Sequence, residues 1–152
     1  MSSLLRVLML IDTVAEADML AHELRRTGFA LAVRCATSEA AYQIALESPL
    51  DLILVDTALP AFDAMRALQI LRASELDIPL IVVTESAGEA SAIECVSLGA
   101  TDFLFKNQPG RLRSAVIRAL DQRDLRAHAR AADVALRESE ERFRSAYDYA
   151  AI

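Results

Sequence analysis

Four residues of this sequence have side chains that could together handle a phosphoryl group. Asp12, Asp56, Thr84 and Lys106 each stand at the end of a short apolar run. Two carboxylates can hold a hard cation such as Mg²⁺, which prefers oxygen ligands and keeps several waters. A carboxylate next to that cation can attack phosphorus, while an ammonium group and a hydroxyl neutralise the phosphoryl oxygens. If the fold brings them together, the four side chains suit the formation of an acyl phosphate.

Each of these residues also has an ordinary structural explanation. A single aspartate at a strand end is usually a helix cap or a turn residue, and Thr84 alone would be an ordinary strand residue. Lys106 alone would be a solvated surface charge, but it is the only Lys among 16 basic residues. A unique ammonium point charge at the end of an apolar strand favours a functional role for Lys106.

Five apolar, β-rich runs would have to position these side chains. They occupy residues 4–11, 29–36, 50–55, 78–83 and 101–105, and helical patterns lie between them at 15–28, 37–48, 63–74 and 88–99. Near-continuous apolar strands indicate burial on both faces, and hence a parallel sheet covered by helices. The alternation predicts an α/β fold, namely a flavodoxin-like (βα)5 doubly wound parallel sheet with strand order 2-1-3-4-5.

In a sheet of this order, ligands bind beyond the carboxyl ends of the strands, where the strand order reverses. Asp12 and Asp56 would flank that switch point, and Thr84 and Lys106 would follow on the two neighbouring strands. The predicted elements therefore bring two carboxylates, a hydroxyl and an ammonium group to one crevice.

The helix boundaries carry their own signals. Gly28 is expected just after the end of the first helix, where a glycine often terminates a helix. Thr37 or Ser38 is expected to cap the second helix, and Asp63 the third, because short polar side chains accept hydrogen bonds from the first free amides. These residues are expected to have structural roles only.

The composition fits one globular domain with an appendage. The chain has 152 residues, 54% of them hydrophobic, and a net charge of −6. The charge is −8 up to residue 110 and +2 beyond it, so an acidic body is not expected to bind nucleic acid. No apolar stretch reaches the ~18 residues that a membrane helix needs. Cys35 and Cys95 lie in apolar runs and are expected to be buried, reduced thiols, which favours a cytoplasmic location.

The last part of the sequence predicts one long helix. Residues 111 to 147 include neither Gly nor Pro. Four apolar residues are expected to pack on the sheet: Leu112, Val116, Ile117 and Leu120. A heptad seam with 4-3 spacing follows at Leu125, Ala129, Ala132, Leu136, Ser139, Phe143 and Ala146. The seam is short, so this segment either forms a dimeric coiled coil or remains a single amphipathic helix. We place the domain boundary between 1–124 and 125–152.

Four stretches of the sequence resemble the receiver domain of two-component response regulators. They are VLMLID, DLILVDTALPAFDA, PLIVVT and GATDFLFK, in this order and spacing. The resemblance implies that Asp56 accepts a phosphoryl group from a histidine kinase or a phosphotransfer protein, and that Asp12 and Asp56 hold Mg²⁺. It also implies that Thr84 and Lys106 contact the phosphoryl group, and that Phe103 changes rotamer together with Thr84.

Several positions depart from the pattern of that family. Two acids usually end the first strand, but Ile11 stands in place of the first, so one carboxylate of the Mg²⁺ site is missing. Ala64 replaces a usual Gly. Glu85 follows Thr84 where a small residue is usual, and it would either add negative charge near the metal or obstruct the site. The alternative is therefore a degenerate pseudo-receiver, an interaction and dimerisation module without phosphoryl chemistry.

The chain itself is not expected to be an enzyme. At most it would take a phosphoryl group onto Asp56 from a donor, because a hydrolase with this nucleophile would need a general acid where Ala58 stands. The stretch ALRESEERFRSAYDYAAI resembles the helix that leads into PAS sensor domains, which implies a downstream output module. The expected partners are a kinase or phosphotransfer protein, that output module and, through the last helix, a second copy of the chain.

Overall fold

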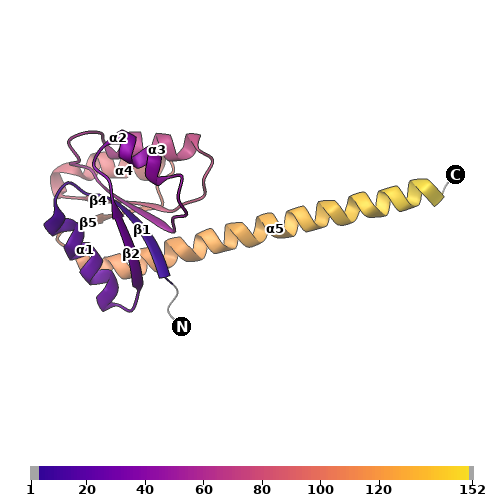
Figure 1. Ribbon diagram of the computed structural model, residues 1–152, viewed down its shortest axis with the longest axis horizontal. Coiled ribbons are helices and arrows are strands. Elements are labelled where there is room, and N and C mark those ends of the chain that lie inside the picture. The colour runs from indigo at the N-terminus through magenta and orange to yellow at the C-terminus, as the bar shows by residue number, and fades with distance from the viewer. Residues whose placement is uncertain (1–3, 151–152) are drawn as a thin grey trace. The chain divides into compact units, whose positions relative to one another are not determined.

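A five-stranded parallel sheet forms the centre of the fold, as predicted. The computed structural model describes the backbone of residues 4–150 and the side chains of residues 4–146. The strands are β1 (Leu4–Leu10), β2 (Ala30–Cys35), β3 (Leu52–Asp56), β4 (Leu80–Thr84) and β5 (Asp102–Phe105). Their order, β2-β1-β3-β4-β5, confirms the predicted topology (Figure 1). The carboxyl ends of β1 and β3 therefore flank the switch point.

Helices cover both faces of the sheet, as parallel strands require. They are α1 (Val14–Arg26), α2 (Glu39–Ala45), α3 (Ala64–Ala73), α4 (Glu89–Ser97) and α5 (Leu112–Ala150), with short 3-10 helices at Ser86–Gly88 and Pro109–Arg111. The second, third and fourth α-helices pack on one face, and α1 and the first turns of α5 on the other (Figure 1).

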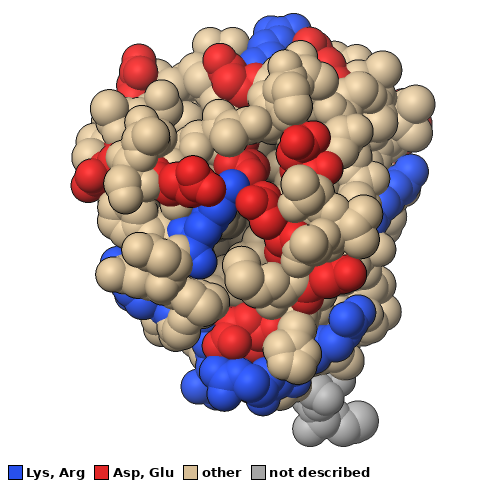
Figure 2. Space-filling model, turned by 90° about the vertical axis from the view of Figure 1, so that its left-hand side faces the viewer, with Lys and Arg blue, Asp and Glu red and all other residues tan. Residues whose placement is uncertain are grey.

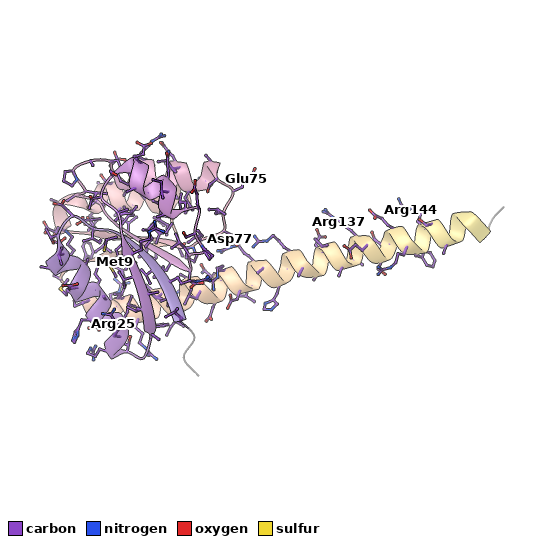
Figure 3. All side chains as sticks on the ribbon, viewed as in Figure 1. Met9, Arg25, Glu75, Asp77, Arg137 and Arg144 are labelled. Carbon is purple, nitrogen blue, oxygen red and sulfur yellow. The ribbon has the colours of Figure 1, made fainter. Side chains whose placement is uncertain are left out.

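The strand residues alternate between two separate hydrophobic clusters. On β1, Leu8 and Leu10 belong to the cluster under α2, α3 and α4, whereas Val7 and Met9 belong to the cluster under α1 and α5. Met9, which is fully buried, lies among the side chains that surround the sheet (Figure 3). Successive side chains of a strand point to opposite faces of the sheet. The same alternation therefore determines on which face the side chain of each strand-end residue lies.

Local capping explains where three of the helices begin. The side chains of Thr13, Ser38 and Asp63 accept hydrogen bonds from the backbone amides three residues later. Ser38, one of the two predicted candidates, is therefore the cap of α2, and Asp63 caps α3 as predicted. Gly28 follows α1 with a φ of +107°, a conformation that residues with a side chain rarely adopt.

The edge strand β2 departs from the sequence expectation. It was predicted to be buried on both faces, but five of its six residues are exposed and the sixth is half-buried. The reason is its position at the rim of the sheet, where a strand has only one neighbour and the seven-residue α2 gives little cover. Cys35 is consequently exposed, contrary to prediction, whereas Cys95 on α4 is buried.

The long helix α5 belongs to two compact units of the chain, Met1–Leu120 and Asp121–Ile152. In the first unit Leu112 and Val116 are buried and Leu120 is partly buried, but Ile117 is exposed, so it does not pack on the sheet as predicted. In the second unit all seven residues of the predicted seam are exposed. Arg137, labelled in Figure 3, pairs with Asp133 one turn earlier at 3.0 Å. Among the described residues, no helix has the length and apolar character needed to cross a membrane.

Candidate functional site

The site is centred on Asp56, the last residue of the central strand β3. Its side chain is almost fully buried, with 1% of the residue exposed. One carboxylate oxygen, Oδ1, accepts a hydrogen bond from the amide of Ala58 at 2.9 Å. The other, Oδ2, lies 2.7 Å from Nζ of Lys106. A buried carboxylate needs such partners, because an unpaired charge away from water is costly.

Lys106 comes directly after β5 and lies between several acidic side chains. Besides Asp56, its Nζ contacts both oxygens of Glu16, at 3.2 and 3.3 Å, and lies 3.9 Å from Glu85. Burial of the ammonium group lowers its pKa, but hydrogen bonds to Asp56 and Glu16 and the charges of both outweigh that effect. The pKa of Lys106 therefore lies above its ordinary value, and this residue is a firmly protonated cation at the acceptor.

Glu16 was not predicted as a site residue. It stands in the first turn of α1, three residues after the cap Thr13, whose hydroxyl accepts from the Glu16 amide at 3.2 Å. Ser/Thr-x-x-Glu is the pattern of a capping box, in which the glutamate would turn back to the helix start. Here the carboxylate contacts Lys106 instead. The position of Glu16 in the sequence could have indicated this role, because the first helical turn after β1 lies at the carboxyl edge of the sheet.

Thr84 ends β4 and is fully buried, but its hydroxyl does not bond to Asp56 or Lys106 in the described structure. It bonds to the hydroxyl of Thr57 at 2.9 Å and to the carbonyl oxygen of Glu85 at 2.8 Å. Of the four predicted residues, the structure thus brings Asp56 and Lys106 into direct contact, whereas the Thr84 hydroxyl bonds to other partners.

A comparison with known protein families agrees with this geometry. The model for the response regulator receiver domain matches residues 7–117. The chain belongs to the response regulator receiver domain family. The match spans the whole sheet apart from the start of β1, and it reaches into α5.

Two relatives of this receiver domain are much longer proteins. It is 30% identical over 139 residues to protein-glutamate methylesterase/protein-glutamine glutaminase 6 of Anaeromyxobacter dehalogenans, covering 85% of this chain and 39% of that one. It is 27% identical over 118 residues to the alkaline phosphatase synthesis transcriptional regulatory protein PhoP of Bacillus subtilis, covering 78% and 49%. The structure of full-length FixJ from B. japonicum shares 26% sequence identity with this chain and superposes on it with a TM-score of 0.73. The match covers 87% of this chain and 66% of FixJ. The receiver domain spans less than half of the first two proteins.

The position where receiver domains usually carry the first of two acids is apolar here. Leu10 of β1 pairs with Val55 of β3, so Ile11 lies beside Asp56. Ile11 is 3% exposed and belongs to the cluster under α1 and α5. The missing carboxylate is therefore replaced by part of the hydrophobic core, while Asp12, the next residue, is exposed.

Receiver domains generally bind Mg²⁺ at the carboxyl edge of the sheet. The acidic side chains at that edge of this chain can be compared with the ligands that Mg²⁺ requires. No group of three or more His, Cys, Asp or Glu residues suited to a metal ion occurs among the described side chains. Asp12 and Asp56 remain, at the ends of neighbouring strands. Mg²⁺ is commonly held by one or two carboxylates and several waters. The donor chemistry therefore fits Mg²⁺ through two carboxylates.

The other predicted positions have clear places in the receiver domain. Phe103 on β5 is half-buried and meets Phe105 edge to face, with ring centroids 5.6 Å apart. Ala64, at the usual Gly position, begins α3 and is buried in the core. The side chain of Glu85 is 71% exposed and lies 3.9 Å from Nζ of Lys106, so it adds negative charge beside the lysine.

A cavity of about 570 Å³ opens beside Lys106. Glu16, Glu85 and Lys106 line it together with Met19, Ser86 and Asn107. Figure 2 shows this side of the molecule, with basic side chains lying between acidic ones. The cavity gives solvent a path to the ammonium group that contacts the buried acceptor carboxylate.

Proposed function

We propose that this chain is a phosphoacceptor receiver domain that takes a phosphoryl group onto Asp56 from a histidine kinase or a phosphotransfer protein. The observation that carries the proposal is the buried Asp56 carboxylate at the end of the central strand, 2.7 Å from the only lysine of the chain. A carboxylate fixed next to a cation suits nucleophilic attack on phosphorus. A merely structural aspartate would not need a lysine held there by a second acid.

The transfer would proceed by attack of an Asp56 carboxylate oxygen on the phosphorus of the donor. An acyl O–P bond forms, the P–N bond to the donor histidine breaks, and the histidine nitrogen keeps the electron pair. Lys106 would then shift its hydrogen bonds from the Asp56 carboxylate to the new phosphoryl oxygens. The stabilisation of those oxygens is electrostatic, since the ammonium group is already in place and needs little reorganisation.

Mg²⁺ would be held by Asp12 and Asp56, and when bound it neutralises the charge that gathers on the phosphoryl oxygens. The exposed Asp12 side chain can accept the ion from solvent, whereas Asp56 would have to loosen its contact with Lys106. We therefore expect weak binding of Mg²⁺ in the resting protein. Replacement of Ile11 by Asp should strengthen the binding, because it restores the carboxylate of the usual pair.

Beryllofluoride, a phosphoryl analogue, tests the proposed acceptor. The NMR spectrum of the isotope-labelled chain should change around β3, β4 and β5 when beryllium, fluoride and Mg²⁺ are added together. Asp56→Asn should show no such change, because the amide cannot complete the beryllium coordination. Asp63→Asn is a matched control, since Asp63 caps α3 and Asn caps helices equally well. A wild-type spectrum that stays the same would contradict the proposal.

The burial of Ile11 favours a second candidate function, a pseudo-receiver that binds partners without phosphoryl chemistry. In that case the Asp56–Lys106 pair would be a permanent ion pair. The two functions differ in Mg²⁺ binding, which calorimetry or Mn²⁺ relaxation can measure. Binding that disappears in Asp12→Ala supports the phosphoacceptor. Metal binding that is the same in wild type and Asp12→Ala supports the pseudo-receiver.

For the second unit, we propose that α5 relays the state of the receiver and pairs with α5 of a second copy. The three largest seam side chains, Leu125, Leu136 and Phe143, are 70%, 57% and 74% exposed, which is unfavourable for a helix alone in water. In a parallel pair, Asp121 would face Arg126 of the other copy, and His128 would face Asp133. The first pair unites opposite charges and the second places an imidazole beside a carboxylate, so the flanks of the seam suit a parallel homodimer.

Sedimentation equilibrium tests the dimer. The wild type should associate, and the double substitution Leu136→Asp and Phe143→Asp should be monomeric, because a charge at a core position is incompatible with a coiled coil. The matched control places Asp at Val134 and Arg144, exposed positions outside the seam. A monomeric wild type at high micromolar concentration would contradict pairing through α5.

We further propose that α5 leads to an output module such as a PAS domain. The support is the likeness of residues 135–152 to a PAS lead-in helix, together with the greater length of the related proteins. The enzymatic and transcriptional functions in the relatives' names belong to those proteins. For this chain we propose no turnover beyond its own phosphorylation.

A further inference from the structure

The hydrogen bonds of Thr84 define which hydroxyl donates. A carbonyl oxygen can only accept, so the hydroxyl hydrogen of Thr84 goes to the carbonyl of Glu85, at 2.8 Å. A hydroxyl has one hydrogen, so Thr84 must accept in its second bond, and the hydroxyl of Thr57 is the donor at 2.9 Å. Thr57, the residue after the acceptor, therefore holds the Thr84 oxygen in a defined position.

Gly88 completes this arrangement from the other side. A side-chain carbon at position 88 would come closer than 3.0 Å to both hydroxyl oxygens, of Thr84 and of Thr57. The φ of Gly88 is −97°, which residues with side chains adopt readily. The backbone conformation thus does not require glycine at this position, but the close approach to the two hydroxyls does.

The hydroxyl pair lies apart from the acceptor pair. By the alternation along the strands, Asp56 follows Leu52 and Leu54 on the face of α1 and α5, whereas Thr84 follows Leu80 and Val82 on the face of α3 and α4. A phosphoryl group on Asp56 could gain a bond from Thr84 only if the Thr84 hydroxyl gave up its present partners. The bond from Thr57 therefore opposes that movement.

We propose that Thr57 is a positioning residue, which together with the space left by Gly88 holds the Thr84 hydroxyl in the resting position and so weakens phosphoryl binding at Asp56. This inference rests on the proposed phosphoacceptor function. It assigns to Thr57 and Gly88 a role that the likeness to the family did not imply.

The expected change in beryllofluoride affinity follows from the loss of the Thr57–Thr84 hydrogen bond in the resting state. Thr57→Val keeps the shape of the side chain and removes the donor. A hydrogen bond between neutral groups corresponds to roughly a two- to tenfold change in an equilibrium, and the Thr57–Thr84 bond is partly buried. The affinity for beryllofluoride should therefore rise by about that factor in Thr57→Val. Gly88→Ala should act in the same direction, because the added methyl group displaces Thr84 from its resting position.

Two measurements on the full chain separate this inference from the proposed function. The first is the beryllofluoride affinity of wild type, Thr57→Val and, as a control, Thr101→Val. Thr101 accepts a hydrogen bond from the Leu80 amide at the opposite end of β4, so its loss should leave the affinity unchanged. The second is the χ1 rotamer of Thr84, measured by methyl NMR couplings without any analogue in wild type and Gly88→Ala.

Tighter binding in Thr57→Val, with a changed Thr84 rotamer in Gly88→Ala, supports the proposal. Equal or weaker binding in Thr57→Val overturns it, as does a Gly88→Ala protein that keeps the wild-type rotamer. If wild type binds no beryllofluoride, the phosphoacceptor function fails, and the rotamer comparison alone then decides whether Gly88 and Thr57 hold Thr84.

Discussion

Both carboxylate oxygens of Glu16 lie within 3.3 Å of Nζ of Lys106, although 90 residues separate the two in the sequence. Glu16 comes from the first turn of α1 and Lys106 from the residue after β5. The contact joins the first turn of α1 to the turn after β5 at the carboxyl edge of the sheet, and it leaves Lys106 one hydrogen with which to bind Asp56. The acidic edge thus keeps a second carboxylate near the acceptor, although Ile11 has removed one.

This contact predicts a shift in the titration of Lys106. Because Lys106 is the only lysine, lysine labelled with ¹³C gives a single side-chain resonance whose shift reports its protonation. Its midpoint should lie above the ordinary value of about 10.4 and should fall in Glu16→Gln, which removes a partner that raises the pKa. Asp18→Asn, on the same helix, is the matched control and should leave the midpoint unchanged. Equal midpoints in wild type and Glu16→Gln would refute the contact.

The same shift has a consequence for stability at high pH. A lysine with a higher pKa in the folded than in the unfolded state stabilises the fold fully below the unfolded value, about 10.4. That contribution is lost as the pH rises through the folded value. The loss should be smaller in Glu16→Gln, as urea denaturation from pH 8 upwards can measure. A steeper loss in that variant would contradict the direction of the pKa shift.

Removal of the Lys106 side chain should show how strongly the buried Asp56 carboxylate destabilises the fold when it lacks its cation. In Lys106→Met the Asp56 carboxylate would stay buried without its cation, and the free energy of unfolding should fall by about 3 kcal/mol. The double variant Asp56→Asn, Lys106→Met should recover much of this loss, because no unpaired charge remains. Urea denaturation at neutral pH measures both. If the double variant were as unstable as Lys106→Met, packing rather than charge would explain the loss.

The cap of α2 gives a sharp test of the local structure. Ser38→Ala should lower the free energy of unfolding by about 1 kcal/mol, because the Ala41 amide loses its hydrogen-bond acceptor. Thr37→Ala, at the exposed neighbouring position, should change it much less. Thermal unfolding of the two variants side by side measures the difference. A larger loss in Thr37→Ala would place the cap one residue earlier.

The two cysteines should differ in reactivity. Cys35 is exposed on β2, whereas Cys95 on α4 is buried, so a thiol reagent should modify Cys35 first. Desolvation and the charge of Asp18 raise the pKa of Cys35, so its rate should still be increasing at pH values above the ordinary thiol pKa. Cys35→Ser should abolish the fast phase. A fast phase that persists in this variant would contradict the exposure of the edge strand.

The sequence predicted the architecture well because buried parallel strands leave a strong pattern. Residues 52–55 and 80–83, which lead to Asp56 and Thr84, are all aliphatic, and the structure buries every residue of β3 and β4. The same pattern failed for β2, since an apolar run does not reveal whether a strand has one neighbour or two. Cys35 was misplaced for this reason.

The site was only partly predictable. Strand ends identified Asp56 and Lys106, because strand order alone brings them to the same edge. The direction of each side chain was not predictable from the sequence, which did not reveal that the Thr84 hydroxyl bonds to Thr57. Glu16 was missed because its capping-box pattern has a sufficient local explanation, and its contact with Lys106 depends on the tertiary fold.

The mass of the intact chain after incubation with an acyl phosphate donor tests the central claim most directly. With Mg²⁺ present, wild type should gain the mass of one phosphoryl group, and peptide mapping should place it on Asp56. The gain should be absent in Asp56→Asn and should be reduced when the metal is chelated. A wild type that gains no mass under these conditions, or gains it equally in Asp56→Asn, would contradict the assignment of Asp56 as the phosphoacceptor.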